Sequence, residues 1–316
     1  MDRAGARRFW LIWAAVLPVA VWGLVRALGL DGGFPLIPLI AYTPYIAALA
    51  LLVAGTAVAL RNWAASALAG LATILLFAAV LPRAVGGAEG LPPGGEELRV
   101  LSANIHHGTA RPGALVGLVE RFDPDILSVQ ELTPRFAREL EAAGLRRRLP
   151  HAVLSTRRGV SGGGLYSRLP IRELPTPPHA GFRMPRGVVT LDGGREVRIV
   201  EVHPYPPKRR MIDVWRAGLR SLPVADPSGA PWILAGDFNA TLDFPELRDL
   251  LDTGYRDAGE VTGDGLEPTW PQGGILPPPV TIDHVLADRR ASILGYEVED
   301  LPGSDHRAVF AALAIP

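Results

Sequence analysis

The sequence predicts an α/β layered domain behind a membrane-spanning helical region. Residues 1–97 hold only 6 Arg and 5 acidic residues, whereas residues 98–316 hold 26 Lys plus Arg and 27 Asp plus Glu. From Leu98 onward, short β-like runs alternate with helical patterns, which is typical of an α/β domain of about 220 residues with one core. We therefore expect a membrane anchor over residues 1–81, a linker over residues 82–97 and a folded domain over residues 98–316.

Three uncharged apolar segments predict the membrane anchor. Phe9–Val25 runs for 17 residues without a charge, Phe34–Leu60 for 27 and Asn62–Leu81 for 20. A helix needs about 20 apolar residues to cross the hydrocarbon core, with a range of roughly 17 to 25. A cleaved signal peptide would explain the first segment only. We expect three transmembrane helices, although the prolines in Phe34–Leu60 can shorten the second.

The arginines of this region predict its orientation. Four of them fall on one side of a three-span arrangement and two on the other: Arg3, Arg7, Arg8 and Arg61 against Arg26 and Arg83. Cytoplasmic loops carry the excess of basic residues, so we expect a cytoplasmic amino terminus and a multi-pass protein of the cytoplasmic membrane. The domain after the third span is then extracytoplasmic, and the loss of one span would reverse this side. Residues 82–97 are rich in Gly and Pro and predict a flexible tether.

Composition excludes several classes of function. The formal net charge is zero, and the folded domain alone carries 26 − 27 = −1, so the counts give no support for a broad basic nucleic-acid face. The chain has no cysteine, which excludes thiol catalysis, thiolate metal sites and disulfides.

The domain divides into strand and helix candidates in order along the chain. The predicted strands are LRVLSANI (98–105), DILSVQEL (125–132), GGGLYSRLPI (162–171), GVVTL (187–191), EVRIVEVHPY (196–205), WILAGDFN (232–239), VTIDHVLA (280–287) and AVFAALAI (308–315). The predicted helices cover residues 112–121, 134–143, 208–222 and 244–251.

Polar residues follow several of these strands. In ILAGDFNA, residues Asp237 and Asn239 are two apart, so an extended backbone turns both to one side while Phe238 turns into the core. An Asx-type turn after the strand explains the same residues without any function. Similar groups occur at other strand ends or just before the last strand: Asn104, Gln130-Glu131, His203, Asp283-His284 and Ser304-Asp305-His306. Each has an ordinary structural explanation when taken singly, but the set together indicates a functional site on rigid elements.

These motifs resemble a known family. SANIHHG, VQEL, GGGLYSRLPI, VHPYPP, ILAGDFNA, PTWP, TIDHVLA and GSDHRAV, in this order, are similar to the endonuclease/exonuclease/phosphatase (DNase I-like) superfamily. The resemblance covers Leu98–Pro316, and the pairing of GDFN with a later SDH is its most specific part. It implies a four-layer α/β sandwich, in which two packed β-sheets are flanked by helices, and metal-dependent hydrolysis of phosphoester bonds. Membrane-attached bacterial members are known.

The resemblance also implies roles for individual residues. Asn104, Glu131 and Asp305 would hold Mg²⁺, since magnesium takes oxygen ligands, and Mn²⁺ would substitute for it. Asp237 would orient or deprotonate the attacking water, Asn239 would hold a phosphate oxygen or that carboxylate, and Asp283 would fix the ring of His306. His203 would donate to the phosphoryl or leaving group, and the sequence leaves open which histidine is acid and which is base. Arg186 and Trp270 are weaker candidates for substrate contact, as are His106 and His107.

We therefore expect a membrane-tethered phosphodiesterase or phosphatase. Its partners would be a phosphoester substrate and the lipid bilayer, and no obligate protein partner is evident. A phospholipid or sphingolipid head-group phosphodiesterase is the alternative that membrane attachment favours. A catalytically silent receptor on the same fold is a further alternative, against which the complete polar set argues.

Overall fold

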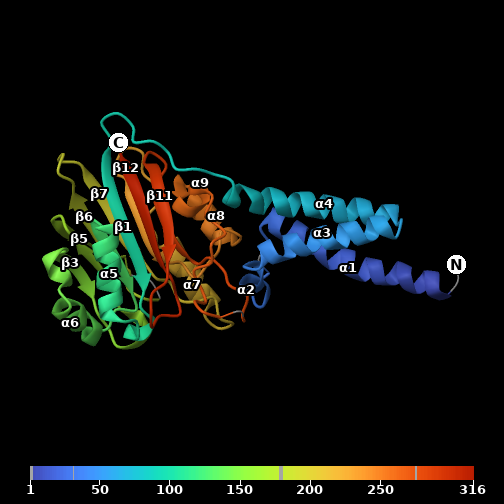
Figure 1. The fold of residues 1–316 in the computed structure, drawn as a ribbon, viewed down its shortest axis with the longest axis horizontal. Helices are drawn as coiled ribbons and strands as arrows, with labels where there is room; N and C mark the ends of the chain where they lie inside the picture. The colour runs from blue at the N-terminus through green and yellow to red at the C-terminus, as the bar shows by residue number, and fades with distance from the viewer. Residues whose placement is uncertain (1–2, 31, 178–180, 275) are drawn as a thin grey trace. The chain divides into compact units, whose positions relative to one another are not determined.

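A computed structural model describes residues 3–30, 32–177, 181–274 and 276–316 (Figure 1). The chain forms two compact units. The helical unit contains Met1–Pro82 with Leu242–Pro245, and the sandwich unit contains Arg83–Thr241 with Glu246–Pro316.

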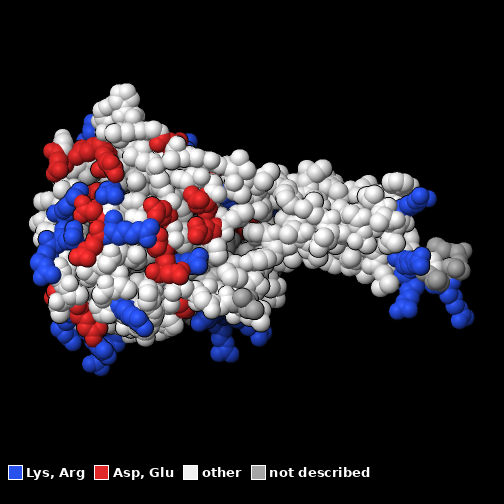
Figure 2. All heavy atoms as spheres, viewed as in Figure 1, with Lys and Arg blue, Asp and Glu red and all other residues white. Residues whose placement is uncertain are grey.

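The helical unit consists of apolar helices. Their bounds are α1 Arg3–Leu28, α2 Leu36–Ile40, α3 Thr43–Ala59 and α4 Trp63–Val80. Small side chains fill the contacts among α1, α3 and α4, and among them Ala50, Ala65 and Ala69 are completely buried. Small residues let helix backbones approach closely, as in membrane helix pairs. Figure 2 shows that the outer surface of this unit is almost free of charge, apart from basic side chains gathered at one end.

The predicted second span is divided in two. Phe34–Leu60 forms α2, a turn at Ala41-Tyr42 and then α3, with Pro44 in the first turn of α3. Within the described residues, Gly5–Leu28 and Trp63–Ala84 are long and apolar enough to cross a membrane, whereas Thr43–Ala59 is shorter. At 17 residues, α3 measures about 25 Å, which is close to the thickness of the hydrocarbon core. Two helices thus fit a crossing by length and composition, and the three-span topology remains a prediction.

The predicted flexible tether is held against the sandwich unit. The backbone N–H of Gly87 donates to Val261 O at 3.0 Å, and that of Glu89 donates to Ile293 O at 2.8 Å. Arg256 donates to the Glu89 carboxylate at 2.7 Å, and this hydrogen bond is the main reason that the pKa of Glu89 is lowered. Ile293 belongs to an edge strand, whose free backbone groups invite such pairing. Gly and Pro content alone could not reveal this partner.

The sandwich unit contains two six-stranded mixed sheets. One sheet has the strand order β11-β12-β1-β2-β4-β3 and the other β5-β6-β7-β8-β10-β9. In the first sheet the strands are β1 Glu96–Asn104, β2 Ile126–Gln130, β3 His151–Ser155, β4 Gly163–Ser167, β11 Ser292–Glu299 and β12 Ala308–Ile315. In the second they are β5 Ile171–Leu174, β6 Arg186–Thr190, β7 Glu196–Val202, β8 Trp232–Asp237, β9 Tyr255–Asp257 and β10 Asp283–Asp288.

Alternation of side chains builds two apolar layers. Along β12, Val309 and Ala311 turn into the core between the sheets, whereas Ala308 and Phe310 turn to the outer core. Both faces of such a strand are buried, so its sequence reads as a continuous apolar run. The outer core includes Leu115 of α5. The sheets are flanked by helices α5 Pro112–Phe122, α6 Pro134–Ala142, α7 Ile212–Arg220, α8 Pro245–Asp252 and α9 Ala258–Thr262. The predicted two packed sheets with flanking helices are confirmed.

Candidate active site

Strand register brings the predicted polar residues to one edge of the sandwich. Asn104 ends β1 and pairs with Gln130 of β2 in the parallel register. In the second sheet Val202 pairs with Gly236, which sets His203 beside Asp237, and Asp237 pairs with Asp283 of β10. The carboxyl ends of parallel strands meet at the same edge of a sheet, so side chains distant in sequence converge there.

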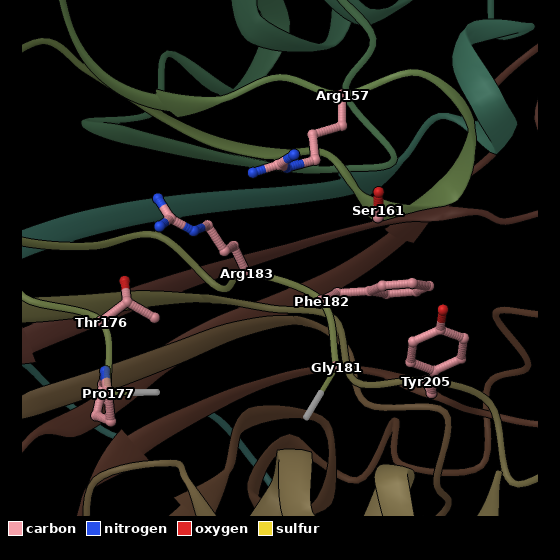
Figure 3. Close-up of a pocket in the computed structure, with 8 residues that line it drawn as sticks. All are labelled: Arg157, Ser161, Thr176, Pro177, Gly181, Phe182, Arg183 and Tyr205. Atoms are coloured by element: carbon pink, nitrogen blue, oxygen red, sulfur yellow. The ribbon is translucent and has the colours of Figure 1, made fainter. Parts of the chain in front are cut away.

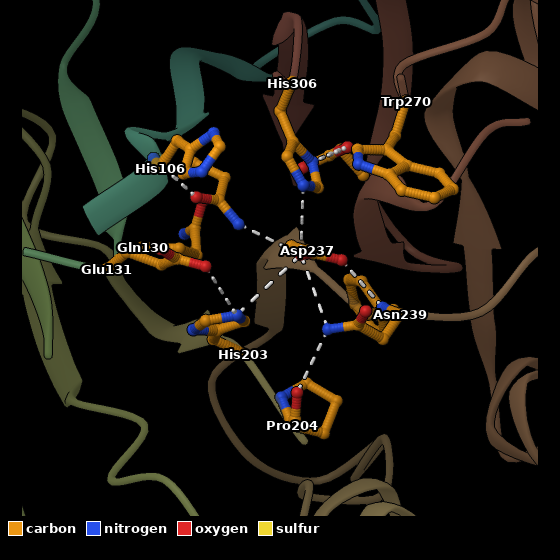
Figure 4. Close-up of polar contacts among 12 residues, drawn as sticks. His106, Gln130, Glu131, His203, Pro204, Asp237, Asn239, Trp270 and His306 are labelled. Carbon is orange, nitrogen blue, oxygen red and sulfur yellow. Dashed lines mark hydrogen bonds and ion pairs between the residues drawn. The ribbon is translucent and has the colours of Figure 1, made fainter. Parts of the chain in front are cut away.

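Asp237 lies at the centre of the group (Figure 4). Its Oδ2 accepts a hydrogen bond from Asn104 Nδ2 at 3.0 Å, and it lies 3.8 Å from both His203 Nε2 and His306 Nε2. Its Oδ1 accepts the backbone N–H of Asn239 at 2.8 Å. The Asx turn is therefore formed through Oδ1, while Oδ2 faces Asn104 and the two histidines.

Asp283 and His306 form the predicted pair. Asp283 Oδ2 lies 2.9 Å from His306 Nδ1, and both side chains are buried. Ligand atoms of Asp237, Asp283 and His306 all lie within 4.8 Å of one another. Because Nδ1 faces Asp283, the other ring nitrogen faces Asp237 and the interior of the group.

The three predicted metal ligands carry the remaining oxygens. Glu131 Oε2 accepts the backbone N–H of His107 at 2.6 Å and lies 2.8 Å from His107 Nδ1. Asp305 Oδ1 lies 2.7 Å from His106 Nδ1, and Asn104 Oδ1 accepts the backbone N–H of His106 at 3.0 Å. His106 and His107 therefore belong to the site itself, in the short 3₁₀ turn His106–Gly108 after β1.

Backbone strain marks the same place. His106, His107, Glu131 and Asn239 have φ angles of 45°, 55°, 60° and 50°, a left-handed region that is costly for residues with a Cβ. They are four of the six non-glycine residues with positive φ in the described part of the chain. Strained residues of this kind persist where surrounding structure holds them, and they cluster at functional sites.

Burial and charge set different protonation states for the two histidines. Burial lowers the pKa of His306, but the carboxylates of Asp283 and Asp237 outweigh it and raise that pKa to about 10. Burial, together with the neighbouring His306 and His107, lowers the pKa of His203 to about 3. Burial raises the pKa of Asp237 to about 7, although His306 opposes this rise. At neutral pH His306 is thus protonated and His203 is neutral.

The two predicted substrate residues differ in position. Trp270 Nε1 donates to Asp305 Oδ2 at 3.2 Å, and the indole lies 6.4 Å from the His306 ring, so Trp270 lines the site. The structure does not bring Arg186 into this group. Its guanidinium is buried and donates to the backbone carbonyl of Ser221 at 2.6 Å. Arg186 stands directly before the apolar residues of β6. A lone basic residue at this place in a sequence does not reveal whether its side chain points inward.

Two residues beside the site were not predicted. Glu201 lies two residues before His203 on the same side of β7, is completely buried, and forms no hydrogen bond of ordinary geometry through either carboxyl oxygen. Burial raises its pKa well above the usual range, and a hydrogen bond from Gln130 opposes this rise. Phe182 packs against the His203 ring with centroids 5.1 Å apart. The alternation EVH was the only available signal for Glu201.

The side chains present fit a hard divalent cation. Asn104, Glu131 and Asp305 offer carboxylate and carboxamide oxygens, the ligands that Mg²⁺ and Mn²⁺ prefer. Asn104 Oδ1 and Glu131 Oε2 accept the backbone N–H groups of His106 and His107, and the carboxylates of Asp305 and Glu131 lie beside the rings of those histidines. The cluster of Asp237, Asp283 and His306 could also hold an ion by distance. Its internal hydrogen bond from His306 to Asp283 is more typical of an acid–base pair.

Comparisons with known proteins agree with this geometry. A family model described as the endonuclease/exonuclease/phosphatase family matches residues 101–306. No curated protein matches the chain. The chain resembles a crystal structure of humanized D. rerio TDP2 carrying 14 mutations, at 18% identity over 69% of this chain and 98% of that one, with a TM-score of 0.55.

Two further solved structures are similar. TDP2 from C. elegans matches at 20% identity over 71% of this chain and 76% of that one, with a TM-score of 0.55. The 3′ phosphatase NExo from Neisseria, bound to a product DNA hairpin, matches at 21% identity over 68% and 98%, with a TM-score of 0.52. Likeness at such low identity establishes the fold alone. The family model covers most of the chain, so this protein belongs to the endonuclease/exonuclease/phosphatase family.

Proposed function

We propose that this member of the family is a metal-dependent phosphodiesterase, anchored in the membrane with its sandwich unit on the extracytoplasmic side. The observation that carries the catalytic part is the position of Asp237. One carboxylate, with its pKa raised to about 7, faces a protonated histidine, a neutral histidine and the amide of Asn104 within 3.8 Å. A base near neutrality beside an acid of higher pKa suits hydrolysis at physiological pH.

The reaction follows from these protonation states. Asp237 orients a water molecule and takes a proton from it as the water oxygen bonds to phosphorus. His306 gives its Nε2 proton to the leaving oxygen as the phosphorus–oxygen bond breaks, while Asp283 holds Nδ1. The neutral His203 directs Nε2–H at a non-bridging phosphate oxygen, and Asn239 steadies Asp237 through its backbone N–H.

A divalent cation held by Asn104, Glu131 and Asp305 would supply positive charge to the phosphate. The chain's own residues then divide the remaining tasks. His306 and Asp237 move protons, Asp283 and Asn104 fix their orientation, and Trp270 closes one side of the site beside Asp305.

Metal dependence is tested on the whole chain in detergent. Hydrolysis of bis(p-nitrophenyl) phosphate should stop in EDTA and return with Mg²⁺ or Mn²⁺. Glu131→Gln should raise the metal concentration needed for half-maximal rate by at least the roughly 10- to 100-fold that loss of an outer-shell partner of a metal ligand costs. Glu139→Gln, on the exposed face of α6, is the matched control and should leave it unchanged. Full activity in EDTA would refute the proposal.

The extracytoplasmic side rests on three crossings by α1, α3 and α4 and on the excess of arginine near the amino terminus. Because the chain has no cysteine, single introduced cysteines report the side directly. Val224, which is 61% exposed, becomes the reporter of the sandwich unit as Val224→Cys, and Arg61→Cys reports the loop between α3 and α4. An impermeant maleimide should label the first in intact spheroplasts and the second only after permeabilisation. The reverse pattern would place the sandwich unit in the cytoplasm.

A phospholipid head-group diester is the second candidate substrate. The apolar helices favour it, and so does the charge of the sandwich unit's surface, where Figure 2 shows basic and acidic side chains interspersed on the face in view. Nucleic-acid binding without sequence preference depends on neutralising many phosphates. Comparing rates on DNA, RNA and phospholipid vesicles under the same metal conditions separates the two classes.

A further inference from the structure

A pocket of about 600 Å³ lies beside the candidate active site. Figure 3 shows two arginines at one end of it and two aromatic rings at the other. The residues that line it include Arg157, Ser161, Thr176, Phe182, Arg183 and Tyr205. The proposed reaction uses none of them.

The arginine end is suited to an anion. Arg157 and Arg183 are both exposed, and Figure 3 shows both side chains extending into the pocket. Within the described ranges, neither guanidinium forms an ion pair, unlike Arg168 or Arg256, which each have a carboxylate. Two positive charges that share one pocket repel each other, and a phosphate between them relieves this repulsion with charge-assisted hydrogen bonds. The Ser161 hydroxyl also lines the pocket, and Figure 3 shows it on the side of the aromatic rings.

The aromatic end joins the pocket to the catalytic group. Phe182 is buried between Tyr205, with ring centroids 4.0 Å apart, and His203, at 5.1 Å. Tyr205 is only half-buried, so part of its ring remains available to a planar or apolar group.

The loop that carries Arg157 is held close to Glu131, a proposed metal ligand. The backbone N–H of Arg157 donates to Leu132 O at 3.1 Å, and Leu132 directly follows Glu131. Two lining residues thus connect the pocket to the catalytic group, since Phe182 contacts His203 and Arg157 is hydrogen-bonded to the residue after Glu131.

We propose that this pocket binds a second phosphate of the substrate, carried on the group that is esterified to the scissile phosphate. The inference rests on the proposed function, because it assigns the substrate class of the same site: diesters with an additional phosphate monoester nearby. Arg157 and Arg183 hold that phosphate, and Tyr205 offers its ring to a planar group of the substrate where the substrate carries one.

The test uses a matched pair of substrates with the same leaving group. Thymidine 5′-(p-nitrophenyl phosphate) has one phosphate, and its 3′-phosphorylated form differs only by the second. For the whole chain in detergent with Mg²⁺, the 3′-phosphorylated ester should have a kcat/KM roughly tenfold higher or more, the scale of a charge-assisted hydrogen bond. Arg157→Gln and Arg183→Gln should each erase most of this preference. The neighbouring exposed Arg158 does not line the pocket, so Arg158→Gln should keep it.

Other outcomes have definite meanings. Equal rates on the two esters, or a preference that survives both substitutions, would overturn the proposal. If neither ester is hydrolysed, the proposed function fails, and calorimetry with thymidine 3′,5′-bisphosphate and thymidine 5′-monophosphate decides the pocket alone. Tighter binding of the bisphosphate that depends on Arg157 and Arg183 supports it, and equal binding refutes it.

Tyr205→Leu distinguishes the source of the second phosphate. A nucleotide should lose affinity in this variant because its base loses a stacking surface. Glycerophosphoinositol 4-phosphate, a lipid-derived diester without an aromatic ring, should depend on the two arginines but not on Tyr205. Arginine dependence with either probe supports the phosphate pocket, and its absence with both contradicts it.

Discussion

Two histidine–aspartate pairs lie at neighbouring positions in the sandwich unit, and the distance from the histidine Nδ1 to the aspartate Oδ2 is the same in both. His306 Nδ1 lies 2.9 Å from Asp283 Oδ2, and His284 Nδ1 lies 2.9 Å from Asp257 Oδ2. Asp283 and His284 are consecutive in β10, so their side chains point to opposite faces. One pair faces the candidate active site and the other faces away from it.

The second ring nitrogen distinguishes the two pairs. His284 Nε2 lies 2.9 Å from the carbonyl oxygen of Ala240, so both of its nitrogens face acceptors and its contacts are complete. Among the described residues, the carboxylates nearest to His306 Nε2 are Asp237 at 3.8 Å and Asp305 at 4.0 Å, both beyond hydrogen-bond distance. A histidine with a free inward nitrogen can exchange a proton with substrate. A histidine held at both nitrogens can only join the elements that hold it.

The largest expected effect separates the pairs by activity. His306→Ala should lower kcat by about 10²- to 10⁴-fold, the usual range for an acid–base group, and Asp237→Asn should do the same. Asp283→Asn combined with His306→Ala should cost about as much as His306→Ala alone, because the two act as one unit. Single-turnover rates on bis(p-nitrophenyl) phosphate measure this, with folding checked by melting temperature. Additive losses would mean that Asp283 acts independently of His306.

Substitutions in the His284–Asp257 pair should lower the free energy of unfolding rather than the rate. His284→Phe leaves the Asp257 carboxylate buried without its cation, and removing one partner of a buried pair costs about 3–5 kcal/mol. The kcat of molecules that remain folded should stay within about threefold of the original. Thermal unfolding followed by tryptophan fluorescence reports the first quantity and active-site titration the second. A stable but inactive variant would show that His284 serves the reaction directly.

The sequence was sufficient to predict the central strands of each sheet but not the edge strands. Each of the eight predicted strands corresponds to a central strand, whereas the edge strands β3, β5, β9 and β11 were not predicted as separate strands. Central strands are buried on both faces and read as apolar runs, as AVFAALAI does. β11, SILGYEVE, is partly exposed and is interrupted by a register shift between Ile293 and Gly295, so its pattern is weak.

The residues in and beside the site likewise fall into two groups, those that the sequence could predict and those that only the fold reveals. Asp237, Asp283 and His306 stand next to apolar runs in recognisable motifs, and the structure brings them together. The paired arginines Arg157 and Arg183 lie in separate loops, and nothing in either segment indicates that both side chains enter one pocket. The buried Glu201 is a similar case, since only the tertiary fold shows that a charged residue type is completely enclosed.

The pH dependence of kcat/KM should be set by the pKa values of Asp237 and of His306, which is paired with Asp283. With the pKa of Asp237 near 7 and that of His306 near 10, kcat/KM should rise toward pH 7 as Asp237 ionises and fall above pH 10 as His306 loses its proton. Asp283→Asn removes a carboxylate that raises the pKa of His306, so the falling limb should move down by about one pH unit or more. His284→Gln is the matched control and should leave the limb in place. An unchanged limb in Asp283→Asn would assign it to another group.

The smallest effect concerns the second pair and appears in stability rather than rate. Burial lowers the pKa of His284, but Asp257 and the Ala240 carbonyl outweigh it, so the folded-state pKa is raised above the usual 6.5. A raised pKa means that the folded chain binds this proton more tightly than the unfolded chain does. The contribution is therefore fully present below about pH 6.5 and is lost as the pH rises through the folded-state value, by on the order of 1 kcal/mol per pH unit. The difference in unfolding free energy between the original chain and His284→Gln should accordingly be largest near pH 6 and shrink toward pH 9, because glutamine has no proton to lose. If that difference were constant over this range, His284 would be neutral in the folded state, and the contrast between the two pairs would then rest on Nε2 alone.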